Sequence, residues 1–227
     1  MMSVTAVIPV KGDSSRLPHK NMLPFAESNL LIHKIRQLKE VKDVTRIVVS
    51  SESDELLSMA EAEGVIAMKR PIQYANESLP ICEFVSWLGR TLEGDHMLWA
   101  CVTSPLVEST LYQKAIDAYF EKLKEGYDSL VTVSPFKHYL MDDNGPFNFS
   151  RGREHPNSQN LQKLYLFTNG IQLTPREKYV EWGDRIGPKA YLMEVSKKEA
   201  IDIDDIYDYK FAISMYEEDR KNDIYGI

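Results

Sequence analysis

Positively charged residues crowd into the first polar stretch of the chain, which has the sequence IPVKGDSSRLPHKN. Lys11, Arg16 and Lys20 are its permanent cations, and Gly12 and Ser14 stand between them. Backbone N–H groups and hydroxyls donate hydrogen bonds and cations neutralise charge, so this combination is typical of a loop that holds phosphate. The whole chain carries a net charge of −7, which makes the positive charge of the loop a local feature. A solvated basic loop that pairs with surface acids is the simpler alternative.

Two carboxylates stand near the end of the chain, in the stretch AIDIDDIYDY. If this segment is extended, Asp202 and Asp204 project from one face, because the side chains of a strand alternate with a period of two. Neighbouring carboxylates repel each other unless a cation lies between them, and Mg²⁺ prefers oxygen ligands. The pair is therefore a predicted magnesium site. In the alternative interpretation, Asp204 or Asp205 caps the following helix and Asp202 is a surface acid.

Other polar residues carry a weaker signal. Thr103 and Ser104 follow an apolar stretch and have hydroxyls to offer a ligand, although Ser-Pro is also ordinary turn chemistry. His138 and His155 fall in a polar segment and are more typical of surface or core residues than of a site. The chain has no nucleophile elbow, and neither the P-loop motif nor G-x-G-x-x-G follows the first strand. These absences argue against a serine hydrolase, a P-loop protein and a dinucleotide-binding protein.

Alternating strand and helix patterns must position these residues. Strands are expected at residues 4–10, 46–51, 65–68, 97–102, 129–134, 163–167, 169–174 and 190–195. Helices are expected at 29–42, from Ser51 or Ser53 to Gly64, and at 80–92, 111–124, after Pro175, and at 205–218. The βαβ rhythm predicts an α/β fold with a Rossmann-like, doubly wound and mostly parallel sheet. Ligand-binding loops of such folds lie beyond the carboxyl ends of the strands.

Composition and length predict one domain over residues 1–227, with residues 135–162 as an inserted loop or subdomain that is polar and rich in turn formers. No apolar run approaches the roughly 20 residues that span a bilayer, and the first residues do not resemble a signal peptide. Cys82 and Cys101 are too few for a disulfide framework or a zinc site. We therefore expect a cytoplasmic protein. A pI near 5.3 disfavours nucleic-acid binding.

The first loop resembles the motif I-P-A-R-x-x-S-[KT]-x-L-P-x-K-[NP] of the CMP-sugar synthetases, the cytidylyltransferases of the acylneuraminate and Kdo type. Lys11 stands where the family has arginine, and Ser14 stands on its serine. Lys20 and Asn21 match the K-N of the sialic-acid branch, whereas the run that begins at Ser15, SRLP, is closer to the T-R-L-P of the Kdo branch. Lysine in place of arginine keeps the charge but loses a bidentate fork.

Four later stretches are similar to the same family and occur in the same order. They are VVSSESDELLSMAEAEGV with the Arg70-Pro71 pair after it, CVTSPL, TNG and AIDIDDIYDY. In the family they correspond to V-S-T-D…G-V, L-Q-P-T-S-P-L, the N-G that lines the sugar pocket, and I-D-I-D-x-x-x-D. The resemblance covers nearly the whole chain and implies a fold of the nucleotide-diphospho-sugar transferase type.

The resemblance implies transfer of CMP from CTP to an acidic sugar, with release of pyrophosphate, in surface glycan biosynthesis. CTP and a small acidic acceptor are then the expected partners, Mg²⁺ the expected cofactor, and a homodimer through the inserted segment the expected assembly. The implied nucleotide-binding residues are Lys11, Gly12, Ser14, Arg16, Lys20 and Asn21. The implied catalytic residues are Lys11, Arg16, Lys20, Asp202 and Asp204, of which the two aspartates also hold the metal. The residues expected to border the sugar are Thr103, Ser104, Asn169 and Gly170.

The acceptor side departs from the family pattern. The sialic-acid branch has an R-Q-x-L-P-x-x-Y run whose arginine meets the sugar carboxylate, and this chain has SQNLQKLY, with Ser158 in place of that arginine and Gln162 in place of the proline. Cys101 replaces the family glutamine. Candidates for anion recognition in their place are Arg151, Arg153 and Lys163. A different acceptor, including a phosphorylated one, and a non-catalytic nucleotide-binding module stay open as alternatives. The G-x-G-x-R loop of sugar-1-phosphate nucleotidylyltransferases is absent.

Overall fold

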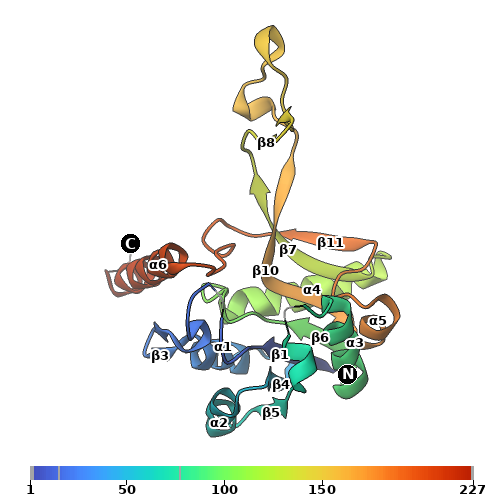
Figure 1. The fold of residues 1–227 in the computed structure, drawn as a ribbon, viewed down its shortest axis with the longest axis vertical. Helices are drawn as coiled ribbons and strands as arrows, with labels where there is room; N and C mark the ends of the chain where they lie inside the picture. Colours follow the sequence, from blue (N-terminus) through green and yellow to red (C-terminus); the bar gives the residue numbers. More distant parts are fainter. Residues whose placement is uncertain (1–2, 15, 77, 226–227) are drawn as a thin grey trace.

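The computed structural model describes residues 3–14, 16–76 and 78–225. The strands of the large sheet are β1 (Val4–Pro9), β4 (Val44–Ser51), β5 (Ile66–Lys69), β6 (His96–Trp99), β7 (Ser129–Phe136), β10 (Leu164–Pro175) and β11 (Ala190–Glu194). They lie in the order β11-β7-β10-β6-β1-β4-β5 (Figure 1). Only β10 is antiparallel to its neighbours in this sheet. The predicted doubly wound, mostly parallel sheet is confirmed.

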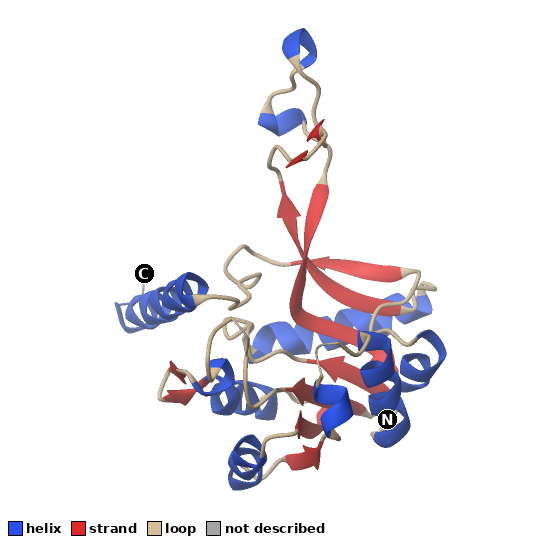
Figure 2. Ribbon diagram, viewed as in Figure 1, coloured by secondary structure: helices blue, strands red, loops and turns tan. Residues whose placement is uncertain are grey.

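Helices cover both faces of the sheet (Figure 2). They are α1 (Leu30–Lys39), α2 (Asp54–Ala62), α3 (Ile81–Thr91), α4 (Ser109–Lys124), α5 (Arg176–Trp182) and α6 (Ile206–Tyr225). Side chains at the starts of α1 and α2 fix two of these boundaries: Asn29 accepts a hydrogen bond from the Ile32 N–H, and Ser53, rather than Ser51, accepts one from the Leu56 N–H. Across the described part of the chain, no helix is both long enough and apolar enough to span a membrane.

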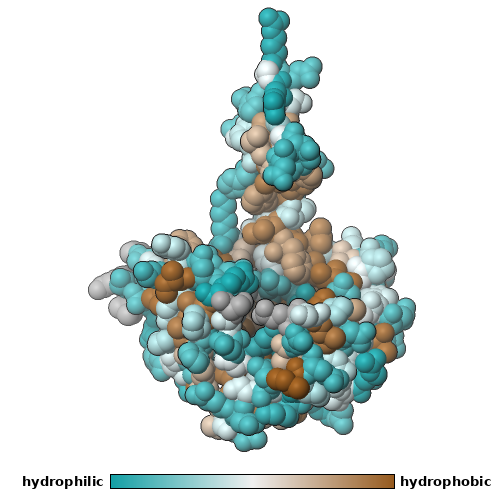
Figure 3. Space-filling model, viewed as in Figure 1, coloured by the Kyte–Doolittle hydropathy of each residue, from teal (hydrophilic) through white to brown (hydrophobic). Residues whose placement is uncertain are grey.

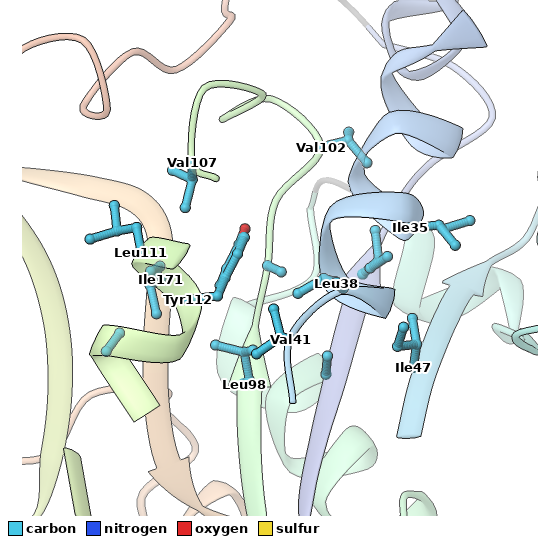
Figure 4. Close-up of a cluster of buried hydrophobic side chains, with 14 of the residues drawn as sticks. Ile35, Leu38, Val41, Ile47, Leu98, Val102, Val107, Leu111, Tyr112 and Ile171 are labelled. Atoms are coloured by element: carbon cyan, nitrogen blue, oxygen red, sulfur yellow. The ribbon is translucent and has the colours of Figure 1, made fainter. Parts of the chain in front are cut away.

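Strand β1 is buried on both faces, as the continuous apolar run predicts. Val4, Ala6 and Ile8 belong to a cluster that also holds apolar side chains of α1 and α4 (Figure 4). Val7 points the other way, into a second cluster with side chains of α3 and α5. Because side chains of a strand alternate between faces, one six-residue strand supports both halves of the core.

Some boundaries differ from the prediction, and the largest difference concerns β10. Two strands were expected at 163–167 and 169–174, but β10 runs through both as one strand. Its register against β7 shifts between Phe167 and Gln172, so residues 168–171 form a bulge. Bulges bend a strand and redirect side chains, which matters here because Asn169 is one of the bulged residues. In addition, β6 ends at Trp99, α1 ends at Lys39 and α6 extends to Tyr225.

The segment between β7 and β10 projects from the sheet as an arm, at the top of Figure 1. It contains a two-residue hairpin, β8 (Met141–Asp142) and β9 (Gly145–Pro146), and two short 3-10 helices, η3 (Gly152–Glu154) and η4 (Ser158–Asn160). The Tyr139 ring lies 5.0 Å from the rings of Phe149 and His155, measured between centroids. The histidine of this cluster is therefore a packing residue of the arm.

Lys34 of α1 is fully buried and ties α1 to the chain that follows β6. Its Nζ donates to the carbonyl oxygens of Ser104 (2.9 Å) and Val107 (3.4 Å) and to the Tyr112 hydroxyl (3.0 Å). Burial lowers the pKa of Lys34 from its ordinary value of 10.5 to about 7. The lysine thus serves as a donor that satisfies buried acceptors, at the cost of a pKa shift.

This shift predicts a pH dependence of stability. Between about pH 7 and 10.5 the unfolded chain holds the Lys34 proton while the folded chain releases it, so the free energy of unfolding rises with pH, by up to about 1.4 kcal/mol per pH unit. Below that window the lysine is charged in both states and the full cost of burial remains. Denaturant unfolding across the window should therefore show a steeper rise for the wild type than for Lys34→Met.

The exposed Lys39 of the same helix provides the matched control. Lys39→Met should keep the wild-type dependence of unfolding free energy on pH. Parallel curves for the wild type and Lys34→Met would contradict the assignment of a lowered pKa to Lys34.

Candidate functional site

A cavity of about 640 Å³ lies where the order of the strands reverses, between β1 and β6. Pro9 and Lys11 reach it from the end of β1, Trp99 and Cys101 from the end of β6, and Asn169 from the bulge of β10. The remaining described residues of its wall are Arg16, Arg70, Tyr74, Asn76, Leu79, Ile81, Phe84 and Arg185. Open α/β sheets bind ligands at such a reversal, and the volume suits a nucleotide-sized ligand.

The cations of the first loop meet a carboxylate from the far end of the chain. Lys11 and Arg16 line the cavity. The Arg16 guanidinium lies 2.7 Å from Asp204 Oδ1, and Lys20 Nζ lies 3.6 Å from the same oxygen. Lys20 Nζ also donates to the Ile203 carbonyl at 2.8 Å. The structure therefore brings two predicted phosphate-binding cations together with one predicted metal ligand.

Gly12 allows the first loop to lie against the start of α2. Its N–H donates to Glu52 Oε1 at 2.7 Å. A Cβ at position 12 would lie 2.9 Å from the Ser53 Cβ, which is closer than real side chains approach one another. Glycine is thus required for the packing of the loop, and its N–H is already engaged by a carboxylate. A contact between Gly12 and nucleotide stays a prediction.

Asn21 shapes the loop from within. Its side chain is buried, and Nδ2 donates to the Lys11 carbonyl at 2.7 Å, which holds the two ends of the loop together. Ser14 is half-buried, and its N–H donates to Asp13 Oδ1 at 2.8 Å. Ser15 lies outside the described residues. The loop conformation that presents Lys11 thus depends on Asn21.

Asp202 has one satisfied and one unsatisfied carboxylate oxygen. Asn169 Nδ2 donates to Asp202 Oδ2 at 2.7 Å. Asp202 Oδ1 is buried, and no hydrogen-bond donor reaches it within the described part of the chain. An unpaired buried carboxylate oxygen is costly, and a hard divalent cation such as Mg²⁺ would satisfy it. Asp202 therefore fits the predicted metal.

The segment between the two aspartates does not pair with a neighbouring strand in the described part of the chain, and the shared face of their side chains stays a prediction. The fully buried Ile203 anchors this segment: its N–H donates to the Thr103 carbonyl at 2.8 Å. Asp202 then faces Asn169 and Asp204 faces Arg16. No group of three or more His, Cys, Asp or Glu side chains is gathered in the described ranges. A metal here would take its other ligands from phosphate and water, as Mg²⁺ commonly does.

The cap of α6 is Asp205, not Asp204. Asp205 Oδ1 accepts hydrogen bonds from the N–H groups of Tyr207 (2.7 Å) and Asp208 (3.0 Å). In return, Asp208 Oδ2 accepts from the N–H groups of Asp204 (2.9 Å) and Asp205 (3.1 Å). This reciprocal arrangement is a capping box. The Asp204 carboxylate is left to the site, where it pairs with Arg16.

Thr103, Ser104 and Gly170 were expected beside the sugar. In the structure they make contacts within the fold and do not line the cavity. Ser104 is buried, and its carbonyl accepts from Lys34. A Cβ on Gly170 would lie 3.0 Å from Val107 Cγ2, so this glycine permits close packing of β10. Thr103 holds Ile203, as described above. Of the four residues expected there, the described cavity wall includes only Asn169. Sugar contacts of the other three stay predictions.

The bulge that presents Asn169 is held by hydroxyls of two threonines. Thr132 Oγ1 lies 2.6 Å from Thr168 Oγ1, and it accepts a hydrogen bond from the Ile171 N–H at 3.1 Å. Thr168 Oγ1 also lies 2.9 Å from the Thr132 carbonyl, to which it can donate. These contacts satisfy buried backbone groups that the broken ladder leaves without partners.

Arg70 is a wall residue to which sequence reasoning gave no role. It is buried, and its guanidinium donates to the Ser50 carbonyl and lies 4.3 Å from the Phe84 ring centroid. Burial lowers the pKa of Arg70 to about 10, so it stays charged at neutral pH. The sequence pointed to Arg70 only through the Arg70-Pro71 pair, which resembles the family. That pair did not indicate that the arginine is buried.

The two roles assigned to neighbouring aspartates predict different effects on stability. Asp205→Ala removes a helix cap and should lower the free energy of unfolding by about 1 kcal/mol. Asp204→Ala removes a half-exposed ion pair and should change it by less than about 0.5 kcal/mol, because such pairs contribute little. Denaturant unfolding of both variants measures the difference. A larger loss for Asp204→Ala than for Asp205→Ala would contradict the assignment of the cap.

Comparisons with known proteins identify the family of the chain. A family model described as cytidylyltransferase matches residues 5–178. The pseudaminic acid cytidylyltransferase of Campylobacter jejuni strain 81-176 is 22% identical, over 95% of this chain and 97% of its own length. The N-acylneuraminate cytidylyltransferase of Escherichia coli O18:K1:H7 is also 22% identical, over 97% of this chain but 54% of its own length. This chain therefore corresponds to about half of that protein.

Solved structures share the fold. CMP:2-keto-3-deoxy-manno-octonic acid synthetase complexed with CTP has a TM-score of 0.71 and 12% identity, covering 96% of this chain and 99% of its own. The 4-diphosphocytidyl-2C-methyl-D-erythritol synthase of Anaerococcus prevotii has a TM-score of 0.67 and 14% identity, covering 95% and 96%. Since the family model spans more than half of the chain, the protein belongs to the cytidylyltransferase family and is a nucleotidyltransferase.

Proposed function

We propose that this enzyme transfers CMP from CTP to an acidic sugar, a sialic-acid-like nonulosonate or a related acid, and releases pyrophosphate for surface glycan biosynthesis. The observation that carries the proposal is the meeting of Arg16 and Lys20 with Asp204 at the cavity between β1 and β6. The sugar class is supported by relatives named for pseudaminic acid and N-acylneuraminate.

The first loop binds the triphosphate through Lys11, Arg16 and Lys20, with Ser14 and Asn21 assisting. Without nucleotide, Arg16 and Lys20 share the Asp204 carboxylate. The Arg16 and Asp204 side chains are 63% and 46% exposed, so their pair contributes less than about 0.5 kcal/mol and opens easily. A triphosphate supplies more negative charge than one carboxylate and takes over both cations.

Asp202 and Asp204 are the residues that would hold Mg²⁺. Asp202 offers its unpaired Oδ1, while Asn169 keeps the carboxylate in orientation through Oδ2. Asp204, whose carboxylate pairs with Arg16 and Lys20, would serve as the second carboxylate ligand when triphosphate binds those cations. Bound Mg²⁺ supplies neutralisation of charge on the α-phosphate and alignment of the reacting oxygens.

The chemistry is an in-line displacement at phosphorus. The anomeric hydroxyl oxygen of the sugar forms a bond to the α-phosphorus, the bond from that phosphorus to the bridging oxygen breaks, and pyrophosphate leaves. The hydroxyl proton passes to solvent. Positioning and charge neutralisation supply most of the rate in such transfers, so the basic loop stabilises the leaving pyrophosphate without forming a covalent intermediate.

The same proposal includes a cytoplasmic homodimer. Both cysteines are free thiols, as expected in a reducing compartment. Large apolar side chains are exposed along the arm and at its base, where Figure 3 shows apolar colour. They are Met141, Phe147, Leu166 and Phe167. Exposed apolar groups gathered in this way favour contact with a second copy.

The metal assignment predicts the effect of Asp202→Asn, which keeps the shape of the side chain and removes its charge. The kcat of CTP-dependent pyrophosphate release should fall about 100-fold or more. Asp143→Asn, an exposed aspartate on the arm, is the matched control and should behave as the wild type. A wild-type kcat for Asp202→Asn at saturating Mg²⁺ would refute the assignment.

The same assay tests the function as a whole, across the four nucleoside triphosphates and with N-acetylneuraminate, pseudaminate, Kdo and a phosphorylated sugar alcohol as acceptors. Release from CTP with one of the acids supports the proposal. Release only with the phosphorylated acceptor favours the alternative substrate, and CTP binding without any release favours a non-catalytic module.

The homodimer predicts that charges on the arm separate the copies. Met141→Lys combined with Phe147→Lys should shift the mass measured by light scattering from dimer to monomer. Asp143→Lys changes charge on the same arm at a polar position and should leave the dimer intact. A monomeric wild type, or a dimer that persists in the double variant, would contradict the arm as the interface.

A further inference from the structure

Arg185 stands in the loop between α5 and β11 and reaches the wall of the cavity. Its guanidinium carbon lies 4.4 Å from the centroid of the Trp99 ring, and Trp99 is buried at the end of β6. The backbone of Arg185 is tied down on both sides: its carbonyl accepts from the Thr174 hydroxyl, and its N–H donates to Asp184 Oδ1. The backbone of Arg185 is therefore held in place, and its guanidinium stacks on the Trp99 ring.

The guanidinium of Arg185 has spare hydrogen-bonding capacity. Its Nε is buried, and no acceptor reaches it in the ranges that the structure describes. A buried N–H without a partner is costly, so its retention beside a cavity points to an acceptor that arrives with a ligand. A stacked, planar guanidinium presents a rigid fork of donors that matches a carboxylate in bidentate geometry.

The order of the strands places Arg185 on one side of the site. Arg70 follows β5, Lys11 follows β1, and Arg185, from the loop between α5 and β11, stacks on Trp99 at the end of β6. Neighbouring strands are about 4.8 Å apart, which separates the β5 side from the β6 side by about three spacings. Lys11, which follows β1, lies between these two sides, and the triphosphate proposed to bind Lys11 would lie there as well.

In-line attack places the acceptor hydroxyl opposite the leaving pyrophosphate at the α-phosphorus, and in the proposed function the first loop holds that pyrophosphate. Arg70 on the β5 side is already engaged by the Ser50 carbonyl and the Phe84 ring. On the β6 side the wall holds Cys101, Asn169 and Arg185, and among the described wall residues no acid is present to neutralise Arg185. An acidic acceptor therefore finds an open guanidinium donor at Arg185, on the side of the wall that Asn169 also lines.

The cations of the arm do not offer the same chemistry. Lys163 Nζ lies 2.6 Å from Glu194 Oε1 and is neutralised by it. Arg151 and Arg153 are exposed side chains on the projecting arm and are not part of the cavity wall. The acceptor acid of this chain has to be recognised elsewhere.

Resting on the function proposed above, we propose that Arg185 binds the carboxylate of the acceptor sugar and so selects acidic acceptors. Ser158 on the arm has no positive charge with which to bind a carboxylate. Arg185, held in place by Trp99, supplies that charge instead. The recognition is bidentate, with Trp99 as the platform that holds the guanidinium plane.

The test compares Arg185→Met and Arg185→Lys with the wild type. With whichever of N-acetylneuraminate, pseudaminate and Kdo is turned over, Arg185→Met should raise the KM for the acid by about 30-fold or more. Arg185→Lys keeps the charge without the fork and should fall between the two. The KM for CTP should stay within about twofold in both variants. Arg153→Met, on the arm, is the matched control and should leave both constants unchanged.

Calorimetric binding of each acid and of its methyl ester to the wild type, loaded with CTP in the absence of Mg²⁺ so that no turnover occurs, gives a readout that does not depend on the variants folding. The acid should bind at least about tenfold more tightly than its ester, and Arg185→Met should abolish that preference. Equal binding of acid and ester, no binding of any of the acids, or an unchanged KM in Arg185→Met would overturn the role of Arg185. Acceptor-dependent pyrophosphate release from CTP that persists alongside such a result leaves the transferase activity standing and removes only this residue from it.

Discussion

The sharing of one Asp204 oxygen by Arg16 and Lys20 is the contact on which the site depends. It joins the first loop of the chain to the segment that precedes the last helix, and Lys20 strengthens the junction through the Ile203 carbonyl. The Lys20 bond to that carbonyl holds the two segments together even when a ligand takes Arg16 from Asp204. The shared contact places the cations of the first loop opposite Asp204, one of the two acids proposed to hold a metal. A nucleotide triphosphate with its cation has the charge pattern that bridges such a pair.

The rest of the fold positions this junction by contacts made far from it in sequence. Gly12 lets the first loop lie against the start of α2, and Asn21 closes that loop on itself. The bulge of β10, held by Thr132, turns Asn169 toward Asp202. The buried Lys34 satisfies the carbonyls of the chain after β6, whose Thr103 in turn holds Ile203. Asn21, Thr132 and Lys34 thus form hydrogen bonds with backbone groups that have no partner in a regular strand or helix.

Local patterns were enough to predict the sheet, the starts of the helices and the basic loop. Apolar runs, a serine cap for α2 and the Pro175 start depend on neighbours within a few residues. The single strand β10 was not predictable in this way, because its bulge depends on Thr132 of another strand. The contacts of Asp202 with Asn169 and of Asp204 with Arg16 were not predictable either, because Ile203 between them is held by Thr103, about a hundred residues away. Arg70 and Arg185 were missed for the same reason, since an arginine becomes informative only when burial and a missing partner are known.

A crystal structure with CTP and Mg²⁺ tests the central claim most directly. The account predicts a triphosphate between the Lys11 loop and Asp202, with the Arg16 guanidinium moved from Asp204 to a phosphate oxygen and the metal on Asp202 Oδ1. A triphosphate bound elsewhere, or one bound here while Arg16 remains on Asp204 and Asp202 Oδ1 remains without a cation, would contradict it.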